Sequence, residues 1–385
     1  MWHKGHMPTW LIFFFVLSVL VLIHELGHFL ASRALGIKVE EFAFGLPFTK
    51  PLWQIKRGET QYSIYPLLFG GFVRLYGEES EIEKEKERSF WSRGRKQRMT
   101  VIAAGVVMNM VLALVGFVLL YAVVGVPTTS VNKVTLVGVE AGSPADAAGL
   151  KPDDQVVAVE GKPIADGAEF SRLMRSWGGI KVNLIVERGT GTTLLEGIAQ
   201  QNIQRMMIEV VPRLNPPEGQ GPLGVHIGDY PYLEVHKCSL LDAKCLMQAI
   251  GAGVKTTGIW VARVADGLRS IGKSLVAGKA PEGVSGPIGI YQLTDVVSQG
   301  GLWPVVELTA VLSVNLAVFN VLPIPALDGG RMFFIWLEWL RRKRMSAQLE
   351  QKINSWGMIA LVGLIALITL QDVIRFGWIS RLISR

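Results

Sequence analysis

The stretch Val16–Leu30, with the sequence VLSVLVLIHELGHFL, combines an apolar helix with a metal-binding motif. His24 and His28 are four residues apart, so on a helix both imidazoles lie on one face and can bind one metal ion. Glu25 is placed to take a proton from a water on that metal. The residues before the motif, Trp10–Ile23, are uncharged and apolar, so this helix is long enough to cross a bilayer.

The alternative for this stretch is a packed core helix whose histidines bind nothing. Ionisable side chains at membrane depth are costly, and a protein that keeps them there usually uses them. We therefore interpret His24, Glu25 and His28 as the centre of a metal site inside the membrane.

The composition indicates an integral membrane protein with soluble parts, because half of the 385 residues are hydrophobic. The net charge of +7 comes from basic residues beside apolar runs, which favours the positive-inside rule over nucleic-acid binding. The N-terminus resembles a signal peptide, but no small-residue cleavage site follows, so we expect a retained first span. Two cysteines, Cys238 and Cys245, are too few for a disulfide framework. We expect two isolated thiols, with a single disulfide as the alternative.

The apolar runs predict an α-helical polytopic membrane protein with four transmembrane helices, a membrane-associated β-hairpin or sheet and an inserted β-rich domain. The predicted divisions are 1–31, the first transmembrane helix; 32–98, a cytoplasmic-side β region and charged loop; 99–126, the second transmembrane helix; 127–230, the extracytoplasmic β-rich domain; 231–301, an amphipathic helix and Gly/Pro linker; 302–330, the third transmembrane helix; 331–355, an amphipathic and basic cytoplasmic segment; 356–376, the fourth transmembrane helix; and 377–385, the tail.

Local patterns predict several smaller elements. Lys38–Phe44 and Gln61–Val73 alternate like strands, and Ala168–Ser176 reads as an amphipathic helix. Cys238–Lys279 has helical periodicity, but its charged side chains favour a helix on the membrane surface over a fifth span. Among them are Lys255, Arg263, Asp266, Arg269 and Lys273. Asn109, inside the second span, is expected to hydrogen-bond a neighbouring helix.

Charge distribution provides an independent test of the number of spans. The basic clusters Arg93–Arg98 and Arg341–Arg344 should both be cytoplasmic, and four spans satisfy this condition. The N-terminus, the region 128–301 and the C-terminus then lie outside. His24–His28 and Asp328 fall on the same, cytoplasmic side, whereas a fifth span would separate them.

A catalytic zinc ion usually has three protein ligands, so a third ligand is required besides the two histidines. Asp328 is the best candidate, because it lies where prolines break the third span. An Asp-Gly turn without metal is the alternative. Glu307 is a rival ligand, but it lies near the other end of its helix, roughly 30 Å away at 1.5 Å per residue.

A peptide substrate inside a membrane is itself a helix and must unwind before its carbonyl groups can react. An unpaired sheet edge within Gln61–Val73 can hold such a segment extended by strand addition. Asn315 and Asn320, on the third span, are the polar side chains that we assign to substrate binding.

Two signatures resemble those of the site-2 proteases: His24-Glu-Leu-Gly-His28 in the first span and Asn320-Val-Leu-Pro-Ile-Pro-Ala-Leu-Asp-Gly-Gly330 in the third. Gly70, Gly71, Phe72 and Val73 resemble the membrane-associated β-loop of that family, and Ser285–Gly289 its loop before a span.

The β-rich region also takes part in the resemblance. It is similar to a PDZ domain, with Leu223, Gly224 and Val225 in a carboxylate-binding loop that comes late, as in circularly permuted PDZ domains. The group that this chain resembles most is the bacterial regulator-of-sigma-E proteases, which often have two PDZ domains where we expect one.

The resemblance implies zinc bound by His24, His28 and Asp328, with Glu25 catalytic and Asn320 supporting the substrate. It implies cleavage of membrane-anchored proteins, such as anti-sigma factors, after another protease has trimmed them. It also implies a multi-pass protein of the bacterial cytoplasmic (inner) membrane with the PDZ domain as a size gate outside. The alternatives are a non-catalytic scaffold that binds peptide C-termini, and a metal transporter, although the polar clusters do not repeat as transporter halves do.

Overall fold

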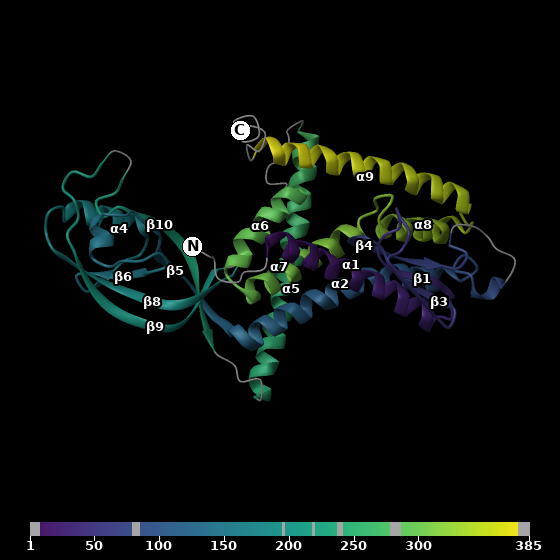
Figure 1. Cartoon of the computed structure of the whole chain (residues 1–385), viewed down its shortest axis with the longest axis horizontal. Helices are drawn as coiled ribbons and strands as arrows, with labels where there is room; N and C mark the ends of the chain where they lie inside the picture. Colours follow the sequence, from purple (N-terminus) through teal and green to yellow (C-terminus); the bar gives the residue numbers. More distant parts are fainter. Residues whose placement is uncertain are drawn as a thin grey trace. The chain divides into compact units, whose positions relative to one another are not determined.

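The computed structural model describes residues 8–78, 85–194, 197–217, 220–236, 242–277 and 286–375. The described part is mostly helical and contains two β-sheets (Figure 1). It divides into two compact units, a helical unit comprising Met1–Val118, Gly253–Gln299 and Val305–Arg385, and a sheet unit comprising Leu119–Ala252 and Gly300–Pro304.

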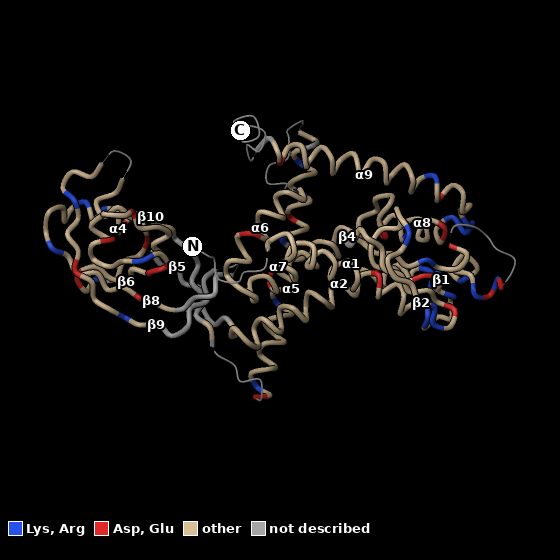
Figure 2. Tube along the Cα trace, in the orientation of Figure 1, with Lys and Arg blue, Asp and Glu red and all other residues tan. Residues whose placement is uncertain are grey.

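Four helices of the described chain are long and apolar enough to cross a membrane: α1 (Thr9–Ala34), α2 (Arg95–Val124), α7 (Leu302–Val321) and α9 (Ala347–Arg375). Figure 2 shows few charges along most of their length, whereas charged residues gather around the smaller sheet. The prediction of four spans is therefore confirmed by length and composition. The last helix begins nine residues before the predicted position 356, because the polar side chains of its first turns contact other parts of the unit. One such side chain is Asn354, whose Oδ1 accepts a hydrogen bond from the Ala326 backbone N–H.

The smaller sheet lies in the helical unit and has the strand order β2-β3-β1-β4. Its strands are β1 (Val39–Leu46), β2 (Trp53–Arg57), β3 (Thr60–Ile64) and β4 (Leu67–Leu75). The run predicted as one strand is split at Pro66, because proline cannot donate to the ladder. The strand β2 was not predicted; it has only five residues, and all of them are exposed. Both β2 and β4 are edge strands.

An apolar cluster fixes this sheet against three helices. Its buried members are Phe29 from α1, Ile37, Val39, Leu75 and Phe90 from the sheet and its flanks, Val101 and Ile102 from α2, and Ile335 from α8 (Asp328–Arg341). A pair of T-shaped ring contacts adds to it, since Phe29 packs on Phe42 and Tyr62. The cluster therefore sets the position of the edge strand β4 relative to α1.

Two buried carboxylates connect helices of this unit. Glu338 of α8 pairs with Arg98 of α2, and both side chains are at most 2% exposed. Asp372 of α9 accepts hydrogen bonds from the backbone N–H groups of Gly286 and Gly289, at 2.9 and 3.1 Å. These groups belong to the first turn of α6 (Pro287–Gln299), so Asp372 caps that helix.

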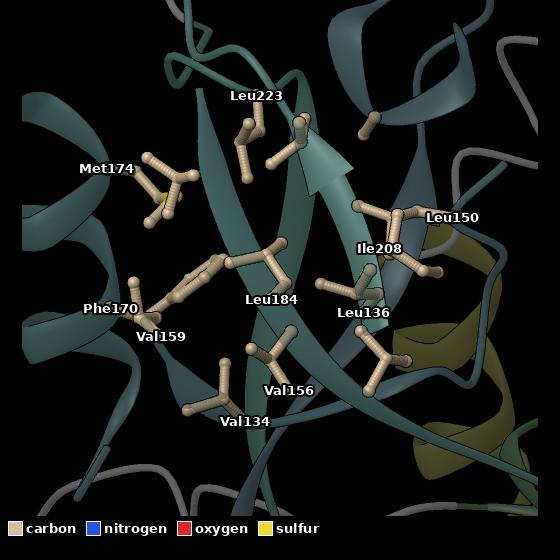
Figure 3. Close-up of a cluster of buried hydrophobic side chains, with 14 residues drawn as sticks. Val134, Leu136, Leu150, Val156, Val159, Phe170, Met174, Leu184, Ile208 and Leu223 are labelled. Atoms are coloured by element: carbon tan, nitrogen blue, oxygen red, sulfur yellow. The ribbon is translucent and has the colours of Figure 1, made fainter. Parts of the chain in front are cut away.

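The sheet unit contains a six-stranded sheet with the order β5-β10-β9-β8-β6-β7. Its elements are β5 (Val126–Val139), α3 (Pro144–Ala147), β6 (Gln155–Val159), β7 (Lys162–Pro163), α4 (Gly167–Ser176), β8 (Val182–Leu194), β9 (Gly197–Val210) and β10 (Val225–His236). Figure 3 shows the core, where side chains of the sheet meet Phe170 and Met174 of α4. The predicted helix at Ala168–Ser176 thus begins one residue earlier than expected.

The helix α5 (Ala243–Val276) follows, and it is not among the four candidate spans. Its amphipathic character and charged residues agree with the prediction from Cys238–Lys279. Cys245, in its first turn, is disulfide-bonded, so the expectation of two isolated thiols is wrong. A disulfide needs an oxidising compartment, which agrees with the expected extracytoplasmic side of this segment. Cys238 lies outside the described residues, as do residues 278–285 and the tail 377–385.

Candidate metal centre and substrate groove

The two histidines of α1 lie against each other as their spacing predicts. Their Nε2 atoms are 3.2 Å apart and their rings meet at 88°. The Nδ1 atom of His28 lies 2.9 Å from the carbonyl oxygen of Val101 on α2. That contact turns the opposite nitrogen, Nε2, toward His24.

A sharp turn after α7 brings the third candidate ligand to the same place. The chain leaves α7 through two prolines, passes Ala326 with a φ of +78°, and starts α8 at Asp328. Gly329 is required here, because a Cβ atom at this position would lie 2.1 Å from the carbonyl oxygen of Leu322. Asp328 Oδ2 consequently lies 3.0 Å from His24 Nε2 and 3.3 Å from His28 Nε2.

The three converging atoms fit a zinc ion. Ligands at 2.0–2.2 Å from a tetrahedral zinc lie about 3.3–3.6 Å from one another, close to the separations found here. Asp328 Oδ2 is buried and accepts no hydrogen bond, so a cation would satisfy it. In the residues that the structure describes, this is the only cluster of three potential ligands, and Glu307 is not part of it.

A cavity of 280 Å³ opens beside the cluster and contains the fourth predicted residue, Glu25. Its other walls come from the edge strand β4, through Phe72 and Val73, and from Asn320. A Cβ at Gly71 would lie 2.9 Å from the Ala43 carbonyl oxygen of β1, and 3.4 Å from Val21 Cγ1 and 3.6 Å from Glu25 Cγ of α1. A larger residue at 71 would therefore collide with β1, whereas its contacts with α1 begin at van der Waals distance.

A second cavity, of 690 Å³, continues from the first between β4, α8 and the start of α9. The two cavities share Phe72, Val73 and Asp328 as walls. Arg331 also lines both, and its Nη1 lies 2.6 Å from Glu78 Oε1. Burial opposes the charge of Arg331, but the nearby Glu78 carboxylate outweighs it and raises the pKa of the guanidinium, which stays charged. The result is a groove along the free edge of β4 that leads to the metal cluster.

The structure brings some predicted substrate residues to this groove and not others. Asn320 Nδ2 lies 3.5 Å from His24 Nε2. Asn315 is not at the site: its amide donates to the carbonyl oxygen of Val311 in its own helix. Five residues correspond to about 140° around a helix, so Asn315 and Asn320 cannot share a face. Gly70, with a φ of +121°, packs on Leu46 and lines neither cavity.

Two residues of α2 belong to the site although no functional role was predicted for them. Asn109 lies 3.1 Å from His24 Nδ1. At Gly105, a Cβ would lie 2.6 Å from His28 Nε2 and 2.7 Å from His24 Cε1. The signal that could have revealed them is their spacing of four residues, which puts both on one stripe of the second span together with Val101.

The loop predicted to bind a carboxylate lies in the sheet unit. The carbonyl oxygen of Leu223 accepts a hydrogen bond from Ala145 N, and that of Gly224 from Glu140 N. Gly224 has a φ of +69°, and Val225 begins β10. Leu223 and Val225 line a small hollow of 50 Å³ beside Phe170 and Met174 of α4.

Comparison with known proteins agrees with this arrangement. Residues 12–364 match the family described as Peptidase family M50. This chain belongs to peptidase family M50. The match covers both ends of the candidate metal centre, so the family includes the elements that carry His24, His28 and Asp328.

Individual relatives of this M50 peptidase are similar over nearly their full length. A protein of Clostridium perfringens that carries a provisional name as a zinc metalloprotease is 33% identical over 93% of this chain and 96% of its own. A Nostoc protein with the same kind of name is 29% identical over 95% and 97%. The zinc metalloprotease RasP of Geobacillus kaustophilus is 26% identical over 94% and 97%.

Family and fold together establish the general character of the protein. It is a site-2 protease, a zinc metalloprotease with four apolar helices of membrane-spanning length.

Proposed function

We propose that this M50 peptidase cleaves peptide bonds within transmembrane segments of membrane-anchored proteins that another protease has already trimmed. The observation that carries the proposal is the convergence of His24, His28 and Asp328 on one point at the end of a groove. The groove is bordered by an edge strand, which is suited to a peptide in extended form.

In this proposal, His24, His28 and Asp328 hold the zinc ion. When bound, zinc supplies Lewis-acid activation of a water and of the peptide carbonyl. The Glu25 carboxylate takes a proton from the attacking water and gives it to the amine nitrogen that leaves as the C–N bond breaks. The Asn320 amide is close enough to this point to donate a hydrogen bond to the substrate backbone.

The substrate is held by β4 in this proposal. One edge of β4 is paired with β1, from Val39–Leu75 to Leu46–Leu67, and the other edge is unpaired by any described strand. An unwound peptide that adds to this edge would satisfy its backbone groups and lie along Phe72 and Val73. Gly71 places this part of β4 beside Glu25, because a Cβ there would lie 3.6 Å from Glu25 Cγ.

The sheet unit is proposed to be a PDZ domain that acts as a size gate outside the membrane. Support comes from the hollow between α4 and β10, which is lined by Leu223 and Val225 at the predicted carboxylate-binding loop. A domain of this kind admits only substrates whose outer part has been removed. The proposed location is the bacterial cytoplasmic membrane, with the N-terminus, the sheet unit and the C-terminus outside, as the basic clusters beside the spans favour. The proposed partners are single-span protein substrates and the lipid bilayer.

The decisive experiment uses the full-length protein in proteoliposomes with a trimmed single-span substrate. The variant Glu25→Gln should cleave about 10²–10⁴-fold more slowly, because it loses the proton carrier, while its zinc content stays the same. Glu59→Gln is the matched control, since Glu59 is an exposed carboxylate paired with Arg88 on the small sheet. Cleavage by Glu25→Gln at the wild-type rate would exclude the proposed mechanism and favour a scaffold.

The gate is tested separately by comparing two substrates that share one transmembrane segment. The trimmed substrate should be cleaved at least about tenfold faster than one with a folded outer domain, since only the folded domain is excluded. Equal rates would contradict gating without affecting the proposed chemistry.

A further inference from the structure

The further inference concerns Asn109, an amide in the middle of the otherwise apolar helix α2. Its side chain is completely buried. Its Nδ2 lies 3.1 Å from His24 Nδ1, while its Oδ1 is buried without a hydrogen-bond partner. A buried amide oxygen without a partner is unfavourable, so this orientation leaves part of the side chain unsatisfied.

The tautomer of His24 determines whether the amide nitrogen or the amide oxygen of Asn109 faces Nδ1. The Nε2 atom of His24 faces His28 and Asp328, so it must present its lone pair if it is to bind zinc. The hydrogen of the neutral ring is then on Nδ1, which becomes a donor. A donor cannot pair with the Nδ2 group of Asn109, which has only hydrogens to offer.

Turning the Asn109 amide by 180° removes the mismatch with His24. The oxygen then occupies the position 3.1 Å from His24 Nδ1 and accepts its hydrogen, and the Nδ2 group takes the former place of Oδ1. The two ends of an amide have nearly the same size, so the turn disturbs no neighbouring atom.

We propose that Asn109 is a positioning residue that holds His24 in its zinc-binding tautomer by accepting a hydrogen bond from Nδ1. The inference rests on the proposed ligand role of His24. It gives α2 the same task at both histidines, because the Val101 carbonyl oxygen faces His28 Nδ1 from the same helix at 2.9 Å. Gly105, between them, leaves room for the two rings. Partners of this kind orient a ligand and typically change metal affinity 10–100-fold.

A purely structural role for Asn109 is the competing explanation. Its backbone oxygen accepts a hydrogen bond of 2.7 Å from Ser313 Oγ of α7, which links two spans. Ser313→Ala removes this link and leaves the Asn109 side chain unchanged, so it separates the two explanations.

The test measures the zinc dissociation constant of the full-length protein in detergent by competition with a chelator, with zinc as the only added ligand. Asn109→Leu should weaken zinc binding about 10–100-fold, because it keeps the size of the side chain and loses the acceptor. Asn109→Asp should stay near the wild-type value, because a carboxylate accepts the same hydrogen bond. Ser313→Ala should also bind zinc normally.

A second variant and a second measurement keep the test decisive if Asn109→Leu folds poorly. Asn109→Ala removes the acceptor without adding bulk, and its zinc-induced rise in Tm, measured against the metal-free protein of the same variant, should shrink. The inference is overturned if Asn109→Leu and Asn109→Ala bind zinc like the wild type. It is also overturned if Asn109→Asp loses as much affinity as Asn109→Leu, or if Ser313→Ala does. His24→Ala tests the ligand assignment: unchanged zinc binding there would refute that assignment and the inference with it.

Discussion

At the centre of the six-stranded sheet, the side chains that meet are Leu136, Leu184 and Val186, none of which has exposed surface. At the centre of the helical unit, the equally buried side chains include Asn109 and Ser313, with His24 beside them. On its outer surface, by contrast, the helical unit exposes apolar side chains. The apolar window of α9 has no buried residue at all, and its leucines and isoleucines point outward.

The difference reflects the solvent against which each unit folds. Water drives apolar side chains into the centre of the sheet unit, at about 25 cal/mol for each Å² buried. Lipid gives no such drive between helices, so packing and hydrogen bonds hold the helical unit together. Its interior is therefore free to hold the polar groups that bind metal, and each of them must find a partner there.

The largest effect is expected at Gly105, where α2 packs on the two histidines so closely that no side chain fits. Gly105→Ala would put a Cβ 2.6 Å from His28 Nε2, so we expect zinc affinity to fall by at least about 100-fold and activity with it. Zinc content after dialysis against a chelator measures the effect. Gly363→Ala, on α9 with open space around it, is the control and should be neutral. Normal zinc binding in Gly105→Ala would mean that α2 does not limit the site.

The second test removes one half of the buried pair between Arg98 and Glu338. Arg98→Met leaves Glu338 as an unpaired charge away from water, so we expect a loss of about 3–5 kcal/mol in unfolding free energy. Unfolding by a denaturing detergent in mixed micelles gives this quantity. Lys181→Met breaks the exposed pair with Glu209 in the sheet unit and should change the unfolding free energy far less, because water screens both charges. Similar losses in both variants would contradict the role assigned to burial.

The third test makes the same truncation in both units. Leu184→Ala in the sheet core should cost about 2–5 kcal/mol, because it removes buried methyl groups and leaves a cavity. Leu364→Ala on the outer face of α9 should change stability by about 0.5 kcal/mol or less, since that side chain is 53% exposed. Hydrogen exchange at β6 and β8, and at α9, reports the two effects locally. A large cost at Leu364 would indicate that another chain covers this face.

The smallest expected effect concerns the side chain that caps the N-terminus of α4. The carboxylate of Asp166 accepts a hydrogen bond of 2.7 Å from Glu169 N, and so caps α4 in water. Asp166→Ala should cost about 1 kcal/mol, and Asp166→Ser should restore most of it. By contrast, α1 begins after Pro8 with no side-chain cap. Circular dichroism during thermal unfolding follows the first effect, and no change on Asp166→Ala would show that α4 depends on packing alone.

Much of the fold could be predicted from the sequence, because the patterns that indicate it extend over many residues. Runs of apolar residues predicted the four spans, and two signatures 300 residues apart predicted the cluster that the structure brings together at His24, His28 and Asp328. The strand β2 was not predicted, because a pattern of only five residues is weak evidence for a strand. The start of α9 was misjudged because its polar first turns contact other elements and not lipid.

The site was predicted less completely than the fold for a physical reason. A ligand histidine belongs to a motif, whereas the group behind it is visible only in three dimensions. Asn109 is a single polar residue in an apolar run, and Gly105 is one glycine among 42, so neither stands out in the sequence. Asn315 was assigned to substrate binding together with Asn320, but helix geometry turns it away and its amide bonds to Val311.

The sharp turn that delivers Asp328 has a consequence for biosynthesis. His24 leaves the ribosome 304 residues before Asp328, so a growing chain carries only two of the three candidate ligands until the turn after α7 has been made. A nascent protein inserted by its first spans alone lacks the full cluster. The candidate metal centre is thus complete only after Asp328 has been synthesised and the turn after α7 has formed, so proteolysis must wait for this step of folding.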